Sequence, residues 1–246
     1  MTRNQDSGFS PFKIAVVGKG NVGAHIFQAL KEKAEVYSVD SRNPDSLTEY
    51  CDVALICVKD DAIGNVVRNF FDKTNVIAHM SGSVSMDVLK NDISRYGVIY
   101  PLQTFTKGVS LDYSQIPFFI EGSDETATDI LSQVASLISP QINYCSSERR
   151  KMLHLASVFA CNFSNALFGI SYELLRETGI NPHLLLPLLK QTVSKLDSLS
   201  PRESQTGPAA RKDFKTMFAH KEMLDTKPEI KEIYELISDV IMNNHH

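Results

Sequence analysis

The sequence contains little cysteine, and its cysteines form no recognisable binding pattern. Cys51, Cys57, Cys145 and Cys161 are scattered along the chain, include no C-x-x-C pair, and lie mostly within apolar runs. Thiols distributed in this way are typical of small buried hydrophobic residues in a reducing compartment, and not of a disulfide framework or a zinc site. We therefore expect a cytoplasmic protein without a structural metal.

The chain also lacks an excess of charge of either sign. Its 25 lysines and arginines are balanced by 29 aspartates and glutamates, and no basic stripe is interleaved with aromatic residues. Because nucleic-acid-binding proteins usually carry such a basic surface, we expect no nucleic-acid partner.

Long apolar runs are missing as well. No uninterrupted apolar stretch is long enough to span a bilayer, and residues 1–11 do not form a secretory signal, so we expect no membrane partner. A chain of 246 residues suffices for one large domain or two ordinary ones.

The most informative feature that the sequence does contain is a glycine-rich stretch near the N-terminus. Residues 12–17 are mostly β-branched or small and apolar, a G-x-G-x-x-G sequence follows, and apolar residues then recur at helical spacing. This strand, turn and helix order is the context in which the motif indicates dinucleotide binding, although a purely structural turn is the alternative. The first glycine permits the turn, the second lets the backbone approach a pyrophosphate, and the third allows close helix packing. The unpaired N–H groups at the start of the helix then hold phosphate, and the predicted cofactor-binding residues here are Gly18, Gly20, Asn21, Val22 and Gly23.

The residues after the second predicted strand, at 35–40, bear on the choice of cofactor. An acid about 20 residues after the first glycine favours the ribose 2′-hydroxyl of NAD, whereas an arginine favours the 2′-phosphate of NADP. Both types are present, as Asp40 and Arg42. Because Ser41 adds a hydroxyl donor beside the guanidinium fork, we predict that Ser41 and Arg42 bind NADP, with NAD as the alternative.

Strand and helix patterns alternate as far as residue 145. Strands are predicted at 52–58, 75–79, 96–100, 116–120 and 142–145, and helices at 60–71, 85–90 and 124–138. This rhythm predicts βαβ units, and hence an α/β fold of the Rossmann type with a doubly wound, mostly parallel sheet. Pro117 indicates either that the strand at 116–120 lies at an edge of the sheet or that the proline occupies the first position of the strand.

Ligands of such sheets bind at the carboxyl ends of the strands. Val58 and Lys59 follow one strand, and His79 and Ser81 lie at the end of the next. We predict that these four residues contact the cofactor. For His79, an equally plausible role is to cap the loop that follows it.

From Ser147 onward the pattern is helical throughout. Helices are predicted at 147–178, 184–196, 211–224 and 229–242, with a polar loop at 198–208. We therefore predict a Rossmann dinucleotide-binding domain over 11–146 and a helical C-terminal domain over 147–246. The abundance of apolar helix faces predicts a homodimer in which the first two helices are partly buried between subunits.

Four motifs together resemble a known family, the Rossmann-like reductases with a helical C-terminal domain of unknown function, often labelled putative NADP oxidoreductases. The motifs are Tyr100-Pro101-Leu102-Gln103-Thr104-Phe105, Ile116-Pro117-Phe118-Phe119-Ile120-Glu121, His154-Leu155-Ala156 with Asn162-Phe163-x-Asn165, and Thr206-Gly207-Pro208-Ala209-Ala210-Arg211-x-Asp213. The chain is more distantly similar to pyrroline-5-carboxylate reductase and the 6-phosphogluconate dehydrogenase group. The resemblance implies that Ser41-Arg42 occupies the 2′-phosphate position and that the long helix after the sheet carries catalytic residues and part of a dimer interface. The Lys-x-x-x-Asn pair of several hydroxyacid enzymes in that group is missing from this helix, where His154 appears instead.

His154 is the candidate proton donor, since the ordinary pKa of histidine lies near neutral pH. Eleven residues complete about three helical turns, so Asn165 is expected on the face of His154, with Asn162 turned partly aside. Gln103, together with Asn162 and Asn165, is expected to orient a substrate. The competing interpretations are a structural His154 and a Gln103 that only orders its loop.

The sequence therefore predicts an NADP-dependent oxidoreductase that transfers hydride to a small carbonyl or imine substrate in the cleft expected between the two domains. The alternative from another class is a non-catalytic dinucleotide-binding redox sensor or assembly protein. An electron-transfer role with a deazaflavin partner is a third hypothesis, which rests on analogy alone.

Overall fold

The computed structural model describes residues 11–90 and 93–244, which belong to two compact units. The first unit extends to Asn162 and the second begins at Phe163. The division expected at residue 147 marks the place where strands give way to helices, and as a domain boundary it remains a prediction.

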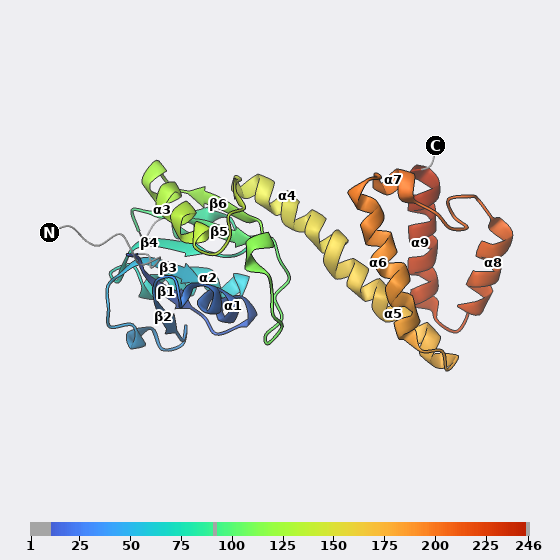
Figure 1. Ribbon diagram of the computed structural model, residues 1–246, viewed down its shortest axis with the longest axis horizontal. Helices are drawn as coiled ribbons and strands as arrows, with labels where there is room; N and C mark the ends of the chain where they lie inside the picture. The colour runs from blue at the N-terminus through green and yellow to red at the C-terminus, as the bar shows by residue number, and fades with distance from the viewer. Residues whose placement is uncertain (1–10, 91–92, 245–246) are drawn as a thin grey trace. The chain divides into compact units, whose positions relative to one another are not determined.

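The first unit is built on one seven-stranded sheet with the order β2-β1-β3-β4-β5-β6-β7 (Figure 1). The strands are β1 (Lys13–Val17), β2 (Glu35–Val39), β3 (Cys51–Ile56), β4 (Thr74–His79), β5 (Tyr96–Pro101), β6 (Phe118–Gly122) and β7 (Ile142–Tyr144). All neighbouring strands run parallel except β5 and β6, which are antiparallel. The predicted Rossmann-type, mostly parallel sheet is therefore confirmed.

Pro117 directly precedes β6, which pairs with β5 on one side and β7 on the other. The edge position considered for this strand is therefore wrong. A proline just before the strand removes no hydrogen bond from the ladder, so an interior strand tolerates it.

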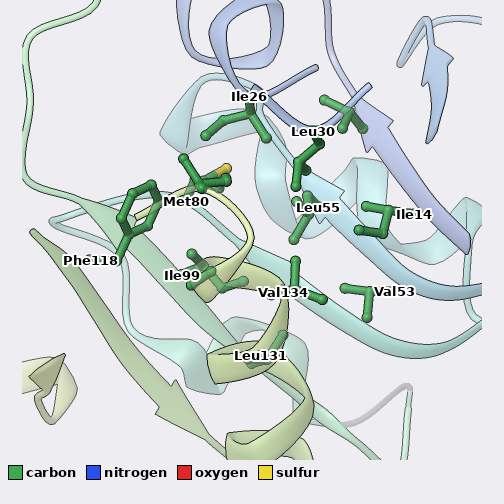
Figure 2. Packing of buried hydrophobic residues seen from close by; sticks show 14 of the residues in the cluster. Ile14, Ile26, Leu30, Val53, Leu55, Met80, Ile99, Phe118, Leu131 and Val134 are labelled. Atoms are coloured by element: carbon green, nitrogen blue, oxygen red, sulfur yellow. The ribbon is translucent and has the colours of Figure 1, made fainter. Parts of the chain in front are cut away.

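Alternate residues of each central strand face opposite sides of the sheet, and both sides are buried. Ile14 and Val16 of β1 belong to one apolar cluster, whereas Ala15 and Val17 belong to the other. Figure 2 shows the first cluster, in which strand residues such as Val53 and Leu55 are packed together with residues of two helices. Continuous apolar strands are required when helices cover both faces, and this explains their sequence pattern.

The helices of the sheet unit are unequal in length. They are α1 (Asn21–Leu30), α2 (Ile63–Val66), α3 (Glu125–Ser136) and α4 (Ser147–Ser157). The helix predicted over 60–71 is α-helical only in α2, with 3-10 turns at Asp60–Ala62 and Val67–Asn69 on either side. Gly64 and the β-branched Val66 and Val67 have low helix propensity, which accounts for the short helix.

The second unit is entirely helical in the part that the structure describes. It contains α5 (Ser164–Glu177), α6 (Leu186–Ser194), α7 (Pro201–Ser204), α8 (Phe214–Met223) and α9 (Pro228–Asn244). The stretch predicted as a loop at 198–208 contains α7, which begins with a capping box between Ser200 and Glu203. That S-x-x-E signal was present in the sequence and explains the extra turn.

A π-helix at Val158–Phe163 joins α4 to α5 and makes one helix from Ser147 to Glu177. This helix is long and apolar enough to cross a membrane by length and composition, and none of its most apolar window is buried. It is not an uninterrupted apolar stretch, because His154, Asn162 and Asn165 lie along it. Placing such polar groups in the hydrocarbon of a membrane costs free energy. The exposed apolar side chains of this helix are therefore better suited to contact with protein than with lipid.

Candidate functional site

The glycine turn has the backbone that its motif requires. Gly18 has a φ of +114°, in the left-handed region, and its N–H donates to the carbonyl of Val39 at 2.9 Å. A Cβ at Gly18 would collide with the carbonyl oxygen of Cys57, directly after β3. The turn therefore excludes side chains at this position for both conformational and steric reasons.

The other two glycines of the motif differ from each other. A Cβ at Gly23 would collide with the carbonyl oxygen of Gly18, so α1 can approach the turn only because Gly23 lacks a side chain. Around Gly20, in contrast, no atom lies within 4 Å of the position that a Cβ would take. The absence of a side chain at Gly20 is therefore not needed for internal packing, and it leaves backbone open to an approaching ligand.

The start of α1 has the features of an anion site. Gly20 is its N-cap and provides no capping side chain, and the first turn contains no acidic residue. The first N–H groups of a helix have no partner within the helix, and the helix dipole favours negative charge there. Lys19 is exposed beside this turn. The turn lies between the ends of β1 and β3, where the strand order reverses and ligands of such sheets bind.

At the end of β2, Arg42 is paired with Asp40. Its Nε and Nη2 donate to the two carboxylate oxygens at 3.2 and 3.1 Å, and its backbone N–H donates to the same carboxylate at 3.0 Å. These bonds from Arg42 lower the pKa of Asp40 to about 2. The arginine side chain is 88% exposed and its Nη1 takes no part in this pair, whereas both oxygens of Asp40 accept from Arg42.

The ends of β3 and β4 give a mixed result for the predicted cofactor residues. Val58 is half-buried and lies beside the glycine turn, and Lys59 is exposed. His79 is fully buried, and its Nδ1 accepts from the N–H of Ser81 at 3.2 Å. Ser81 in turn accepts from the N–H groups of Ser83 and Val84, each at 3.1 Å. The geometry thus favours the loop-capping role of His79, and cofactor contact through its side chain stays an untested prediction.

His154 lies beside a pocket of about 430 Å³ at the end of β5. Its Nδ1 is 3.3 Å from the hydroxyl of Tyr100, and the two rings meet edge to face. A Cβ at Gly82 would lie 2.7 Å from Nδ1 and 2.8 Å from the Tyr100 ring, so only glycine fits there. The pocket is lined by Tyr100, Leu102, Gln103, Thr104, His154, Ser157, Ala160, Cys161 and Asn162. Three of the four predicted catalytic residues, His154, Gln103 and Asn162, are therefore brought together.

The π-helix explains why Asn162 lines this pocket. On an unbroken α-helix, Asn162 would be rotated by about 80° from His154. One additional residue in the π turn reduces this rotation to about 20°, so both side chains share a face. The regular spacing that was assumed for His154 and Asn165 is interrupted by this turn. Asn165 belongs to the second unit, and its predicted role is untested.

Glu121 and Arg150 are residues of this region that the sequence analysis did not select. Arg150 is fully buried, forms an ion pair with Glu121 of β6, and donates to the carbonyl of Val84 at 2.6 Å. Ser147 donates to the same carboxylate through its N–H and hydroxyl at 2.8 and 2.7 Å. Arg150 precedes His154 by four residues on α4, so this network fixes the helix face that carries His154. The one available signal was the position of Glu121 at the end of a family motif.

The loop after β5 is held by polar contacts within the unit. The side-chain oxygen of Gln103 accepts from the N–H of Thr104 at 2.8 Å, so part of its polar group orders the loop. His25 of α1 pairs through Nε2 with the carbonyl of Thr106 and through Nδ1 with the hydroxyl of Tyr113, at 2.9 and 3.0 Å. The candidate group for a hydrogen bond to a substrate is therefore the side-chain amide nitrogen of Gln103.

The cysteines are all free, and no group of three or more potential metal ligands occurs among the residues described. Cys51 and Cys57 are buried as expected, and burial raises the pKa of the Cys57 thiol to about 12. Cys161 is exposed, so the expectation of a buried residue is wrong for this position. The reason is that the apolar face of the helix from Ser147 to Glu177 is not covered by the chain itself.

The fold and the glycine turn are those of the Rossmann-like α/β proteins with a helical C-terminal region. The sequence model of one family, described as a domain of unknown function (DUF2520), matches residues 116–241, and the chain belongs to this family. It is 30% identical to the putative NADP oxidoreductase BF3122 from Bacteroides fragilis, with a TM-score of 0.86 and coverage of 95% of this chain and 98% of that chain. The chain thus shows homology to the NAD(P)-dependent oxidoreductases.

Two further structures share the fold. Protein TM1727 from Thermotoga maritima is 23% identical, with a TM-score of 0.71 and coverage of 94% of this chain and 98% of that chain. The pyrroline carboxylate reductase from Plasmodium falciparum, solved with NADP bound, is 10% identical, with a TM-score of 0.58 and coverage of 96% and 100%. A comparison with curated proteins gives no match.

Proposed function

We propose that this protein is an NADP-dependent reductase that transfers hydride to a small carbonyl or imine compound. The observation that carries the proposal is the glycine turn, in which Gly18 and Gly23 are required by packing while Gly20 faces open space. A backbone left open at the start of a helix is what a pyrophosphate needs. The 30% identical relative from Bacteroides fragilis, described as a putative NADP oxidoreductase, supports the same cofactor.

NADP fits the charges at the end of β2. Arg42 and Ser41 would hold the 2′-phosphate, because an arginine fork and a hydroxyl together satisfy several phosphate oxygens. The N–H groups of Asn21 and Val22 would hold the pyrophosphate at the start of α1. Asp40, which a ribose 2′-hydroxyl would need as an acceptor, is occupied by Arg42.

The pocket beside His154 would hold the substrate. When bound, the nicotinamide supplies the hydride, and the protein has to orient the substrate, exclude water and provide a proton. His154 would donate this proton to the oxygen or nitrogen that gains charge, while the amides of Gln103 and Asn162 would hydrogen-bond to the substrate. Glu121 and Arg150 would keep the helix face of His154 in place.

The experiment is a titration with NADPH followed by a turnover screen of small oxo-acids, aldehydes and imines. We expect NADPH to bind more tightly than NADH, and His154→Gln to abolish most turnover while NADPH affinity is unchanged. Absence of binding for both nicotinamide cofactors would refute the proposal. Tight binding with a silent screen would favour the alternative, a non-catalytic redox sensor.

We also propose that the protein is a cytoplasmic homodimer. None of the residues of α5 and α6 is buried, and the large apolar side chains of Leu167 in α5 and of Leu188 and Val193 in α6 are 37%, 61% and 64% exposed. So many apolar side chains on two helices exceed what a monomer normally exposes, and a second copy of the chain would cover them symmetrically. Light scattering after gel filtration should give twice the chain mass, and Leu188→Glu should give monomers. A monomeric wild-type protein would contradict this.

A further inference from the structure

His25 of α1 is a buried polar residue to which the proposed mechanism gives no role. The residue is 6% exposed, and both of its ring nitrogens are hydrogen-bonded. Nε2 lies 2.9 Å from the carbonyl oxygen of Thr106, and Nδ1 lies 3.0 Å from the hydroxyl of Tyr113. These partners are 81 and 88 positions further along the chain, in the loop between β5 and β6. One imidazole therefore fastens two points of this loop to α1.

The partners of the ring determine where its protons lie. A carbonyl oxygen can only accept, so Nε2 carries a hydrogen and donates it to Thr106. A neutral imidazole has one N–H group, and its Nδ1 therefore accepts from the hydroxyl of Tyr113. Nε2 keeps its hydrogen in the protonated ring as well. The bond to Thr106 is thus present in both charge states of His25.

The carbonyl of Thr106 also closes a tight turn. It accepts from the N–H of Val109 at 3.1 Å, and Gly108 has a φ of +84°, as a type II turn requires at its third position. The ring of Phe105, directly before this turn, lies 5.2 Å from the imidazole of His25. Apolar packing therefore brings the loop to α1, and the donor on Nε2 fixes where the turn lies along the helix.

The two ends of this connection lie at the two candidate sites. Leu102, Gln103 and Thr104 line the pocket beside His154, and Thr106 follows only two residues later. At the other end, α1 begins directly after Gly20, where we propose that the pyrophosphate binds. Because α1 is a continuous helix of 10 residues, His25 sets the place of the pocket loop relative to the glycine turn.

We propose that His25 is a positioning residue that ties the loop lining the pocket to α1 and thereby keeps Gln103 and Thr104 in place. This inference rests on the proposed function only for its catalytic consequence. His25 bonds to the loop and not to reacting atoms, so it acts through Gln103 and Thr104. A substrate held by a displaced loop would lie in a poorer position for hydride transfer, to which rates are very sensitive.

Hydrogen exchange followed by mass spectrometry tests the tie without cofactor or substrate. His25→Phe keeps an aromatic ring in the buried position but removes both hydrogen bonds. In this variant the amides of residues 102–109 should exchange roughly 10-fold faster than in wild type, as expected for the loss of neutral hydrogen bonds. Tyr113→Phe, which removes one bond and disturbs the packing least, should give a smaller increase in the same peptides. His25→Gln, whose amide can donate to Thr106, should exchange more slowly there than His25→Phe.

Lys33→Met is the matched control. Lys33 lies three residues after the end of α1, and its Nζ donates to the carbonyl of Leu137 at 2.6 Å, so it ties the same region to a different segment. This variant should leave exchange at 102–109 unchanged. Wild-type exchange of the loop in His25→Phe, or faster exchange spread evenly over the whole sheet unit, would overturn the inference.

Kinetics give a readout that a general loss of structure would not reproduce. With an active substrate, His25→Phe should lower kcat/KM by roughly 10-fold, the effect of about one hydrogen bond, while the Kd for NADPH is unchanged. A parallel loss of NADPH affinity would mean that α1 itself is disturbed and would contradict a positioning role. If the loop exchanges faster as expected but no substrate is ever turned over, the inference on His25 stands and the proposed function fails.

Discussion

The carboxylate of Glu121, at the end of β6, is paired with the buried guanidinium of Arg150, four residues before His154 on α4. The two residues are 29 positions apart in the chain. The pair therefore joins the sheet to the helix that carries the candidate proton donor. Its strength determines how firmly that helix is held.

Glu121→Gln should destabilise the protein strongly. The glutamine keeps the shape but leaves the buried Arg150 cation without its counter-charge, and removing one partner of a buried ion pair costs about 3–5 kcal/mol. Urea unfolding monitored by circular dichroism measures this loss. Glu49→Gln is the control, because Glu49 pairs with Lys13 at the surface and such pairs contribute at most about 1 kcal/mol. Equal losses in the two variants would show that the pair does not anchor α4.

The two glycine variants Gly20→Ala and Gly23→Ala should separate cofactor binding from folding. The first adds a methyl group in open space, so the protein should fold with a free energy of unfolding within about 1 kcal/mol of wild type, yet bind NADPH weakly. The second creates a clash with the carbonyl of Gly18 and should lower the stability itself. Calorimetric titration and thermal unfolding of both variants provide the test. Unimpaired NADPH binding by the folded Gly20→Ala protein would argue against a pyrophosphate at this turn.

The glycine turn and the sheet were predictable from the sequence because their signals are local. The turn is fixed by three glycines at set spacing, and parallel strands buried on both faces appear as continuous apolar runs. Long-range pairing carries no such signal. No local pattern indicates that Glu121 faces Arg150 or that Tyr100 faces His154, since each contact forms only when separate strands and a helix meet.

The π-helix shows a second limit of sequence interpretation. Val158 to Phe163 continue an apolar pattern that is compatible with an ordinary α-helix, so the extra residue in the turn was not expected. That residue changes which asparagine shares the face of His154. Spacing arguments along a helix therefore hold only as far as its backbone stays regular.

Arg42→Ala should change the choice of cofactor. It removes charge-assisted hydrogen bonds to a 2′-phosphate, each of about 1.5–3 kcal/mol, so the Kd for NADPH should rise by roughly 10- to 100-fold. NADH lacks this phosphate, and the variant frees Asp40 as an acceptor for its 2′-hydroxyl, so NADH should bind as well as before or better. Parallel titrations with both cofactors measure the ratio. The control is Arg68→Ala, which removes another exposed arginine and should leave the ratio of the two Kd values unchanged. An equal loss of affinity for NADPH and NADH in Arg42→Ala would contradict the assignment of Arg42 to the 2′-phosphate.

His79 should make stability depend on pH between about 4 and 6.5. Burial lowers its pKa from 6.5 to about 4, the nearby Arg150 acts in the same direction, and the Ser85 backbone and Asp60 oppose it. Because the unfolded chain binds the proton more readily, this contribution is complete above pH 6.5 and declines by roughly 3 kcal/mol towards pH 4. Chemical unfolding at several pH values measures the slope. His79→Asn keeps an acceptor for the Ser81 N–H but cannot titrate, so its profile should be flatter over this range. Parallel profiles for the two proteins would assign the acid sensitivity to other groups.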